Sequence, residues 1–330
     1  MKNNQPSEAP DFAVEITGLS KTYAGNSMQP LKKALINVNL EIPRGSFFGL
    51  LGPNGAGKST IINIMAGLVL KTSGDVKVWG YDIDSEMRQA RSAIGVVPQE
   101  LNIDPFFTPR EILEVQAGLY GVPKAQRRTE EILAAVRLTD KADSYARTLS
   151  GGMRRRMLVA KAMVHSPPIL VLDEPTAGVD VELRQQLWSY IRSLRDLGAT
   201  ILLTTHYLEE AEELCDQIAI INNGQVVTSQ QTDDLLRTLD SKELIITVDK
   251  NLTAAPEGLN RFNVELKNSR KLVFRVPPSK VPVEEVLEAV RAEGLGIADL
   301  TTKESDLEGI FLMMTRENNG QQDEDGGGIM

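Results

Sequence analysis

The sequence predicts an α/β domain with a largely parallel sheet, followed by a smaller α+β domain. Three observations lead to this fold class. Short β-branched runs alternate with helical stretches from about Phe12 to Asp233. Several of these runs are apolar without alternation, as expected for strands that are covered on both faces. After Asp240 the pattern changes to strands with alternating polar residues, and no catalytic motif is evident there.

These patterns divide the chain into four parts. They are a flexible N-terminus at 1–11, an α/β domain at 12–239, an α+β domain at 240–316 and a tail at 317–330. The tail is acidic and rich in glycine, a composition that cannot bury enough apolar surface to order itself. We therefore expect it to be disordered.

Composition narrows the class of protein. The 330 residues carry a formal net charge of −9, which disfavours a nucleic-acid binder that relies on a broad basic surface. The single cysteine, Cys215, excludes an internal disulfide framework and is expected to be a buried packing thiol. No secretory signal and no apolar run of the ~18–20 residues needed to span a bilayer is evident, so the reduced cytosol is the expected compartment. Any role at a membrane would then come through a partner.

The elements of the first domain have recognisable ends. The clearest strands are Ser46–Leu51, Ile169–Leu172 and Thr200–Thr204. Thr108 and Glu111 form a capping box around Pro109, which predicts the start of a helix. A second helix, Val181–Leu197, is expected to end at Gly198 in a left-handed cap.

The second domain alternates short strands with two helices. The expected strands are Glu243–Asp249, Phe262–Lys267, Leu272–Val276 and Gly296–Thr301, and the expected helices are Val283–Ala292 and Asp306–Thr315. In the last helix Leu307, Ile310, Phe311 and Met314 recur at helical spacing. This spacing predicts a buried apolar face, packed either within the chain or against the same helix of a second copy.

A glycine-rich loop follows the first of the apolar strands. Residues 52–60 read G-P-N-G-A-G-K-S-T and lead from a strand into a helix, the context expected of a phosphate-binding loop. Backbone amides and the positive end of the helix dipole would hold the phosphates of ATP. Lys58 would meet the β- and γ-phosphates, and the Ser59 hydroxyl would ligate Mg²⁺. The residues expected to contact the nucleotide here are Gly52, Asn54, Gly55, Gly57, Lys58, Ser59 and Thr60.

Two acids end the apolar strand at 169–172. Asp173 would project from the carboxyl end of that strand, where ligands bind in open α/β sheets, and would hold Mg²⁺. Glu174 follows directly and is placed to deprotonate the attacking water. An apolar strand that ends in Asp-Glu is common and often leads only into a surface turn. The phosphate loop upstream favours a catalytic role for these two acids.

Five further segments resemble the ATP-binding-cassette (ABC) ATPases, in that family's order. Leu149–Met153 (LSGGM) resembles the LSGGQ signature, Tyr23 the aromatic residue that stacks on adenine, and Gln99 the Q-loop glutamine. Ala177–Asp180 resembles the D-loop, and His206 the switch histidine. The resemblance covers about residues 12–233 and implies a P-loop NTPase fold with a helical subdomain at about 100–160.

The resemblance implies a set of site residues and partners. The catalytic residues would be Glu174, His206 and Lys58. Ser150, Gly151 and Gly152 would bind the γ-phosphate of ATP held by a second copy, with Asp180 at the same interface, so that a head-to-tail dimer encloses two ATP molecules. Ser59, Gln99 and Asp173 would hold Mg²⁺. His165 lacks such a context and is expected to be structural, and Arg154–Arg156 to form a solvated basic face.

Within the family, the amino-acid sequences at 173–188 and 203–216 resemble those of the ATPases of ABC-2-type exporters, and most of all those of the bacterial YadG-like ATPases. This implies a cytoplasmic motor subunit, peripheral on the inner face of the plasma membrane, that powers a separate integral-membrane permease. The competing class, an ABC protein acting on DNA or the ribosome, is disfavoured by the single cassette and by the short interval between Lys58 and Ser150. We therefore expect no nucleic-acid partner. Phe106 and Phe107 either pack internally or line a groove for the permease, and the sequence favours neither.

Overall fold

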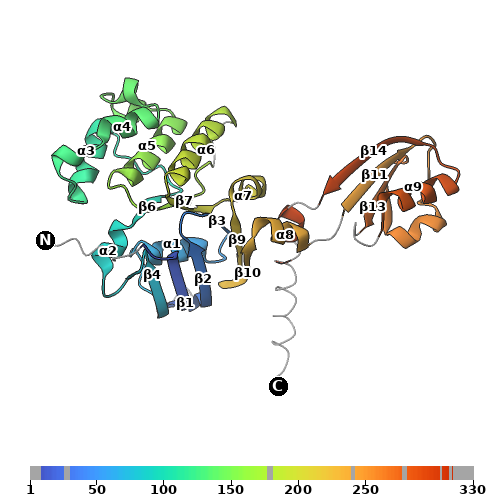
Figure 1. The fold of residues 1–330 in the computed structure, drawn as a ribbon, viewed down its shortest axis with the longest axis horizontal. Coiled ribbons are helices and arrows are strands. Elements are labelled where there is room, and N and C mark those ends of the chain that lie inside the picture. Colours follow the sequence, from blue (N-terminus) through green and yellow to red (C-terminus); the bar gives the residue numbers. More distant parts are fainter. Residues whose placement is uncertain are drawn as a thin grey trace, which may run out of the picture. The chain divides into compact units, whose positions relative to one another are not determined.

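The computed structural model describes residues 9–25, 30–176, 181–238, 242–276, 281–304, 307–311 and 314 (Figure 1). The chain forms two compact units, Met1–Gln231 and Thr232–Met330. This division falls a few residues before the predicted one at 239–240, because the helix α8 (Thr232–Thr238) groups with the second unit. Most of the expected flexible N-terminus and the expected tail at 317–330 lie outside the described residues.

The first unit contains two sheets. The larger has six strands in the order β10-β9-β3-β8-β7-β6, and β9, β3, β8, β7 and β6 run parallel. Its strands are β3 (Phe47–Leu51), β6 (Ile94–Val97), β7 (Ile169–Asp173), β8 (Thr200–Thr204), β9 (Gln217–Asn222) and β10 (Gln225–Gln231). All five residues of β3 and all five of β8 are buried, which confirms the prediction that apolar runs without alternation are strands covered on both faces.

The smaller sheet of the first unit is antiparallel, in the order β2-β1-β4-β5. It comprises β1 (Phe12–Tyr23), β2 (Lys32–Pro43), β4 (Ser73–Val78) and β5 (Tyr81–Asp82). Helix α1 (Lys58–Met65) shares one apolar core with both sheets through Ile61, Ile62, Ile64 and Met65. The helix that follows the phosphate loop is thereby fixed between them.

Helices form a separate layer of the first unit. Helices α3 (Pro109–Leu119), α4 (Thr129–Ala135) and α5 (Gly151–Met163) lie together in Figure 1 and share their own apolar cluster. The predicted capping box is present, because the Thr108 hydroxyl accepts from the Glu111 amide and the Glu111 carboxylate accepts from the Thr108 amide. The remaining helices of the unit are α2 (Met87–Ser92), α6 (Val181–Asp196) and α7 (Leu208–Leu214). Gly198 follows α6 with φ of 96°, the left-handed conformation expected there.

Cys215 lies in the core of the first unit and is 6% exposed. A Cβ added at Gly49 would stand 3.0 Å from its sulfur, so the thiol packs directly on strand β3. Burial raises the pKa of the thiol far above its ordinary value.

We expect Cys215 to resist a thiol reagent such as DTNB in the native protein and to react with one equivalent after denaturation. Both effects have one cause: the thiolate is the reactive form, and burial suppresses it. Rapid labelling of native protein, with an unchanged circular dichroism spectrum, would contradict the buried position.

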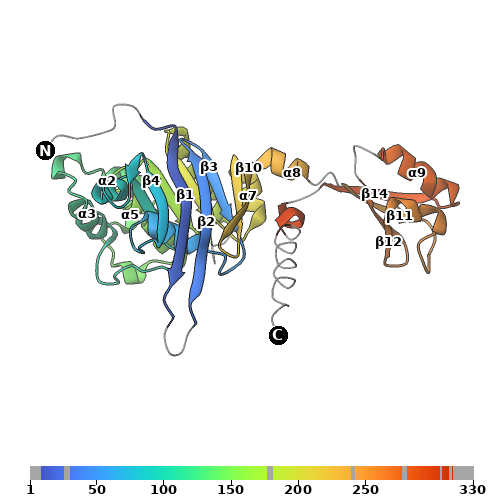
Figure 2. The ribbon, with the colours of Figure 1, turned by 90° about the horizontal axis from the view of Figure 1, so that it is seen from below.

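The second unit holds one antiparallel sheet in the order β12-β13-β11-β14. The strands are β11 (Lys242–Val248), β12 (Val264–Lys267), β13 (Lys271–Val276) and β14 (Ile297–Glu304), and helix α9 (Val283–Ala292) lies along one face of the sheet (Figure 2). Phe262 was expected to begin a strand. It instead ends a 3₁₀ turn, Glu257–Phe262, and its ring packs edge-on against Phe274 in the core.

The last described residues, 307–311 and 314, are helical. Leu307 and Ile310 are fully buried within the single chain, and Phe311 and Met314 are half-buried. This confirms the predicted apolar face and favours packing within the chain over packing against a second copy.

Candidate active site

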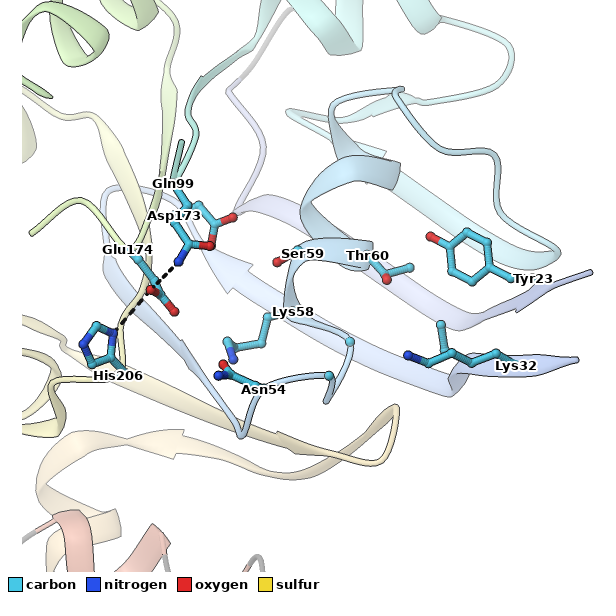
Figure 3. Close-up of a pocket in the computed structure, with 13 residues that line it drawn as sticks. Tyr23, Lys32, Asn54, Lys58, Ser59, Thr60, Gln99, Asp173, Glu174 and His206 are labelled. Carbon is cyan, nitrogen blue, oxygen red and sulfur yellow. Dashed lines mark hydrogen bonds and ion pairs between the residues drawn. The ribbon is translucent and has the colours of Figure 1, made fainter. Parts of the chain in front are cut away.

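A cavity of about 580 Å³ lies at the carboxyl edge of the parallel sheet (Figure 3). The loops that follow β3, β6, β7 and β8 all contribute to it, because the carboxyl ends of neighbouring parallel strands meet at one edge. The residues that line it are Tyr23, Lys32, Ala34, Asn54, Gly55, Gly57, Lys58, Ser59, Thr60, Gln99, Asp173, Glu174 and His206. The structure therefore brings together most of the predicted site residues, from segments spread over more than half of the chain.

The phosphate loop depends on two of its glycines. Gly57 has φ of 115° and caps α1, and a Cβ there would stand 2.9 Å from the Ala34 carbonyl oxygen. A Cβ at Gly52 would stand 2.3 Å from the Ile221 carbonyl oxygen. Neither position admits a side chain, so the loop can follow strand β3 and turn into the helix only with glycine at both.

The Lys58 ammonium group spans this loop. Its Nζ donates to the Gly52 carbonyl at 2.7 Å and to the Pro53 carbonyl at 3.2 Å. Burial lowers the pKa of Lys58 from its ordinary value, and the carboxylates of Glu174 and Asp173 act in the opposite direction. A partly desolvated cation that two carbonyl oxygens of the loop hold in place is well positioned to bind the phosphate of a nucleotide.

The two acids after β7 are held by the neighbouring strand β8. The Thr204 hydroxyl donates to Asp173 Oδ1 at 2.5 Å, and the Glu174 amide donates to the Thr204 carbonyl at 3.0 Å. Glu174 has φ of 49°, a left-handed conformation that is uncommon for a residue with a Cβ. This turn sends its side chain into the cavity, where it is 13% exposed.

Glu174 is the centre of the polar contacts in the cavity. Gln99 Nε2 donates to Glu174 Oε2 at 2.8 Å, and His206 Nδ1 lies 3.3 Å from the same oxygen (Figure 3). The carboxylate thus faces the cavity between a Q-loop amide and the imidazole of His206. A water molecule held there would meet a base and two polar neighbours.

Tyr23 lies at the opposite end of the cavity, at the end of β1. Tyr23 is 38% exposed, and the Lys21 ammonium lies 4.7 Å from the centroid of its ring. Lys32, its partner across the β1–β2 pair, also lines the cavity. The position of Tyr23 fits its predicted role as an open aromatic surface for a base. Lys32 was not predicted, since no local motif marks it and only the strand register places it here.

The oxygen donors of the cavity fit Mg²⁺. Ser59, Gln99 and Asp173 supply a hydroxyl, an amide and a carboxylate, the hard ligands that this ion prefers. Within the described ranges no group of three or more His, Cys, Asp or Glu side chains could hold a metal ion. A donor set this sparse suits Mg²⁺, which usually keeps waters and substrate phosphates among its ligands.

The signature segment does not join this cavity. Ser150 is the N-cap of α5, and its hydroxyl accepts from the Met153 amide at 3.3 Å. Ser150, Gly151 and Gly152 are absent from the cavity lining of the described chain. Asp180, the predicted D-loop residue, lies outside the described residues.

The arginines after the signature do not form the expected solvated face. Arg155 is only 4% exposed, and its guanidinium donates to the Pro98 carbonyl at 2.9 Å, next to Gln99. Arg156 donates to the Val136 carbonyl at 2.8 Å within the helical layer. Three successive residues of α5 cannot all face solvent, because the helix packs against both α3 and α4. The expectation of a solvated face at 154–156 was therefore wrong. Arg154 donates to the Arg147 carbonyl in an exposed turn, and Arg156 donates also to the exposed Arg137 carbonyl at 3.2 Å.

His165 has the structural role predicted for it. Its ring stacks on Tyr120 with centroids 3.7 Å apart, and Nε2 lies 3.3 Å from the Ile94 carbonyl oxygen. Burial lowers the pKa of His165 to about 4.

The fold and the cavity define a P-loop ATPase, and comparison with known proteins identifies its family. A family profile described as ABC transporter matches residues 35–177. The Nod factor export ATP-binding protein I of Ralstonia nicotianae is 40% identical over 92% of this chain and 93% of its own length. The daunorubicin/doxorubicin resistance ATP-binding protein DrrA of Streptomyces peucetius is 35% identical over 95% of this chain and 94% of its own.

A solved structure supports the same assignment. The cassette MJ0796, determined as a dimer in a post-hydrolysis state bound to ADP and Pi, aligns with a TM-score of 0.60 and 29% identity, over 66% of this chain and 98% of its own. The chain belongs to the ATP-binding proteins of ABC transporters. It is an ATPase that drives transport as the motor subunit of such a transporter. In the part of the chain that the structure describes, none of the helices has the length and apolarity to cross a membrane.

Proposed function

We propose that the chain acts as a homodimer with two shared ATP sites, docked on the cytoplasmic face of a membrane protein through which it drives export. The observation that carries this proposal is the separation of the signature from the cavity. The N-terminus of α5, with the exposed Ser150 and Gly151, can bind an anion, and among the described residues it does not line the cavity of its own chain. A second copy arranged head-to-tail would supply that phosphate. MJ0796 is itself a dimer.

Each residue of the cavity has a distinct task in hydrolysis. The amides of the phosphate loop and the Lys58 ammonium hold the β- and γ-phosphates, and Tyr23 stacks on the base. Ser59, Asp173 and Gln99 would hold Mg²⁺, which when bound neutralises charge on the β- and γ-phosphates. Glu174 takes the proton of the attacking water, and His206 holds the γ-phosphate beside it.

The direction of transport is inferred from relatives. The two relatives named above are described as export and drug-resistance proteins, and each aligns over more than nine-tenths of both chains. This supports export by the complex in which the present chain works. The transported substrate would be selected by the membrane partner.

The helical layer offers a docking place for that partner. A groove of about 210 Å³ on α3 and α5 is lined by the apolar residues Ile103, Phe107, Ile112, Val115, Leu119 and Met157 and by the polar residues Asp104, Gln116 and Lys161. Phe107 is 40% exposed and Leu119 is 77% exposed, which is unusual for side chains of this size. An amphipathic helix of the permease would cover both. This favours the second of the two interpretations of Phe107.

We expect Phe107→Glu and Leu119→Glu each to weaken membrane association about 10- to 100-fold, since each removes about 1.5–3 kcal/mol of apolar burial at the groove. The measurement is the fraction of tagged full-length chain that sediments with membranes of the producing organism, and the membrane protein that co-purifies with it. Leu197→Glu is the matched control, because Leu197 is 84% exposed and lies after α6, away from the groove. Sedimentation of both groove variants at the level of this control would contradict the docking place.

A further inference from the structure

Behind the cavity lies a buried carboxylate with no part in the roles given above. Glu210, in α7, is 7% exposed. Its Oε2 accepts from the Thr176 hydroxyl at 3.0 Å and from the Thr205 hydroxyl at 3.1 Å. Thr176 is the last described residue before the D-loop, and Thr205 directly precedes His206. One carboxylate oxygen thus holds the starts of two loops that come from different strands.

A second set of contacts reaches His206 from the other side of the same carboxylate. Arg184, in α6, places Nε 3.3 Å from Glu210 Oε1, and its guanidinium lies 4.6 Å from the centroid of the Tyr207 ring. The Tyr207 ring lies 4.0 Å from that of His206. The Tyr207 amide in turn donates to the Thr205 hydroxyl at 3.0 Å. The residues on both sides of His206 are therefore tied to Glu210, directly or through Arg184.

These contacts constrain an imidazole that is otherwise open. His206 is half-exposed, at 51%, and its polar contact in the cavity is with Glu174. A side chain this open keeps its place mainly through the backbone on which it is mounted. That backbone is fixed by Thr205 and Tyr207, and both depend on Glu210.

We propose that Glu210 is a positioning residue for hydrolysis, which holds His206 in reach of Glu174 and the γ-phosphate and links it to the start of the D-loop. The inference rests on the role proposed above for His206. It adds to the reaction a residue that does not line the nucleotide cavity of the described chain.

A purely structural role for Glu210 makes the opposite prediction for one substitution. Replacement of a buried ion pair by an apolar side chain of similar size is often neutral or stabilising, because the desolvation cost of the charge disappears. Glu210→Met would then give a folded and active protein. If Glu210 positions His206, the same variant is folded but slow, since Thr176 and Thr205 lose their shared acceptor.

The test is steady-state ATP hydrolysis by the full chain, in the wild type and in a His206→Ala background. We expect Glu210→Met to lower kcat about tenfold with KM for ATP changed less than about twofold, the size expected when a reacting group is displaced without loss of binding. Glu210→Gln keeps a side-chain oxygen that can accept from Thr176 and Thr205, so we expect this variant to retain most of the wild-type kcat. In the His206→Ala background Glu210→Met costs less than about twofold, because residues that act through one another are not additive.

Glu209→Met is the matched control. Glu209 is the preceding residue of α7 and is exposed, so its replacement removes the same charge from the same helix without touching the network. If Glu210→Met does not fold, Thr205→Val and Thr205→Ser carry the test, and only the serine variant retains the rate.

The results distinguish the positioning role of Glu210 from the role of His206 on which it depends. Wild-type activity in His206→Ala alone would overturn the role of His206. A loss in His206→Ala, together with the full tenfold cost of Glu210→Met in that background, would overturn only the positioning role of Glu210. An unchanged kcat in Glu210→Met would do the same.

Discussion

Glu174→Gln lowers steady-state ATP hydrolysis by at least about 10²-fold while ATP binding is preserved, because the substitution removes the base and little else. The amide has the same shape as the carboxylate, and its oxygen can still accept from Gln99, which lies 2.8 Å away. The substitution also removes a negative charge from the place where the phosphates of ATP would bind. ATP therefore accumulates in the site, and we expect the protein to shift to a closed dimer by size-exclusion chromatography in ATP.

Lys58→Ala is the comparison for this variant. It removes the ammonium group that spans the phosphate loop, so it should weaken nucleotide binding itself and give neither hydrolysis nor the closed dimer. The two variants are both inactive, and a nucleotide-binding assay distinguishes them. Hydrolysis near the wild-type rate in Glu174→Gln would remove Glu174 from the role of base.

The parts of the fold and of the site that the sequence predicts are those defined by local geometry. The phosphate loop requires glycine at positions such as Gly57, where φ is 115° and a Cβ would meet backbone. The capping box at Thr108 and Glu111 is likewise closed within one helical turn. Asp173 and Glu174 follow because a strand buried on both faces must expose what comes after its carboxyl end. In each case a few consecutive residues determine the outcome.

The residues that sequence reasoning missed are defined by contacts between distant segments. Arg155 is bonded to a carbonyl 57 positions away, and Thr176 to a carboxylate 34 positions away. Nothing near Arg155 distinguishes a buried arginine from its two neighbours in the run at 154–156. Glu210 is equally hidden, since Glu209 beside it has the same chemistry and the helical register alone decides which of the two is buried.

The distance between the signature and the cavity within one chain is explained by dimer assembly rather than by the fold of the chain. Every motif of the site is present once in the chain, yet Ser150 and Lys58 do not line one cavity in the described structure. A two-fold dimer makes each motif available twice, so two complete sites can form from one sequence. Shared sites of this kind can be tested by mixing two variants that are each inactive alone.

We expect a mixture of Ser150→Arg and Lys58→Ala chains to hydrolyse ATP although neither variant does so alone. Random association gives mixed dimers in about half of the molecules, and each has one intact site made from the Lys58 of one chain and the Ser150 of the other. The expected rate is thus about a quarter of the wild-type rate. Ser150→Arg blocks the anion-binding end of α5 and removes its N-cap, at a cost of about 1 kcal/mol of helix stability, so melting temperatures must show that the chain is folded.

The control for this mixture replaces Lys58→Ala by a chain that carries both substitutions. Its mixed dimers with Ser150→Arg chains form equally often but contain no intact site, so activity should stay at background. Activity in the first mixture and none in the second requires that one site be built from two chains. Background activity in both mixtures would contradict a site that the Lys58 of one chain and the Ser150 of the other complete without a second intact site.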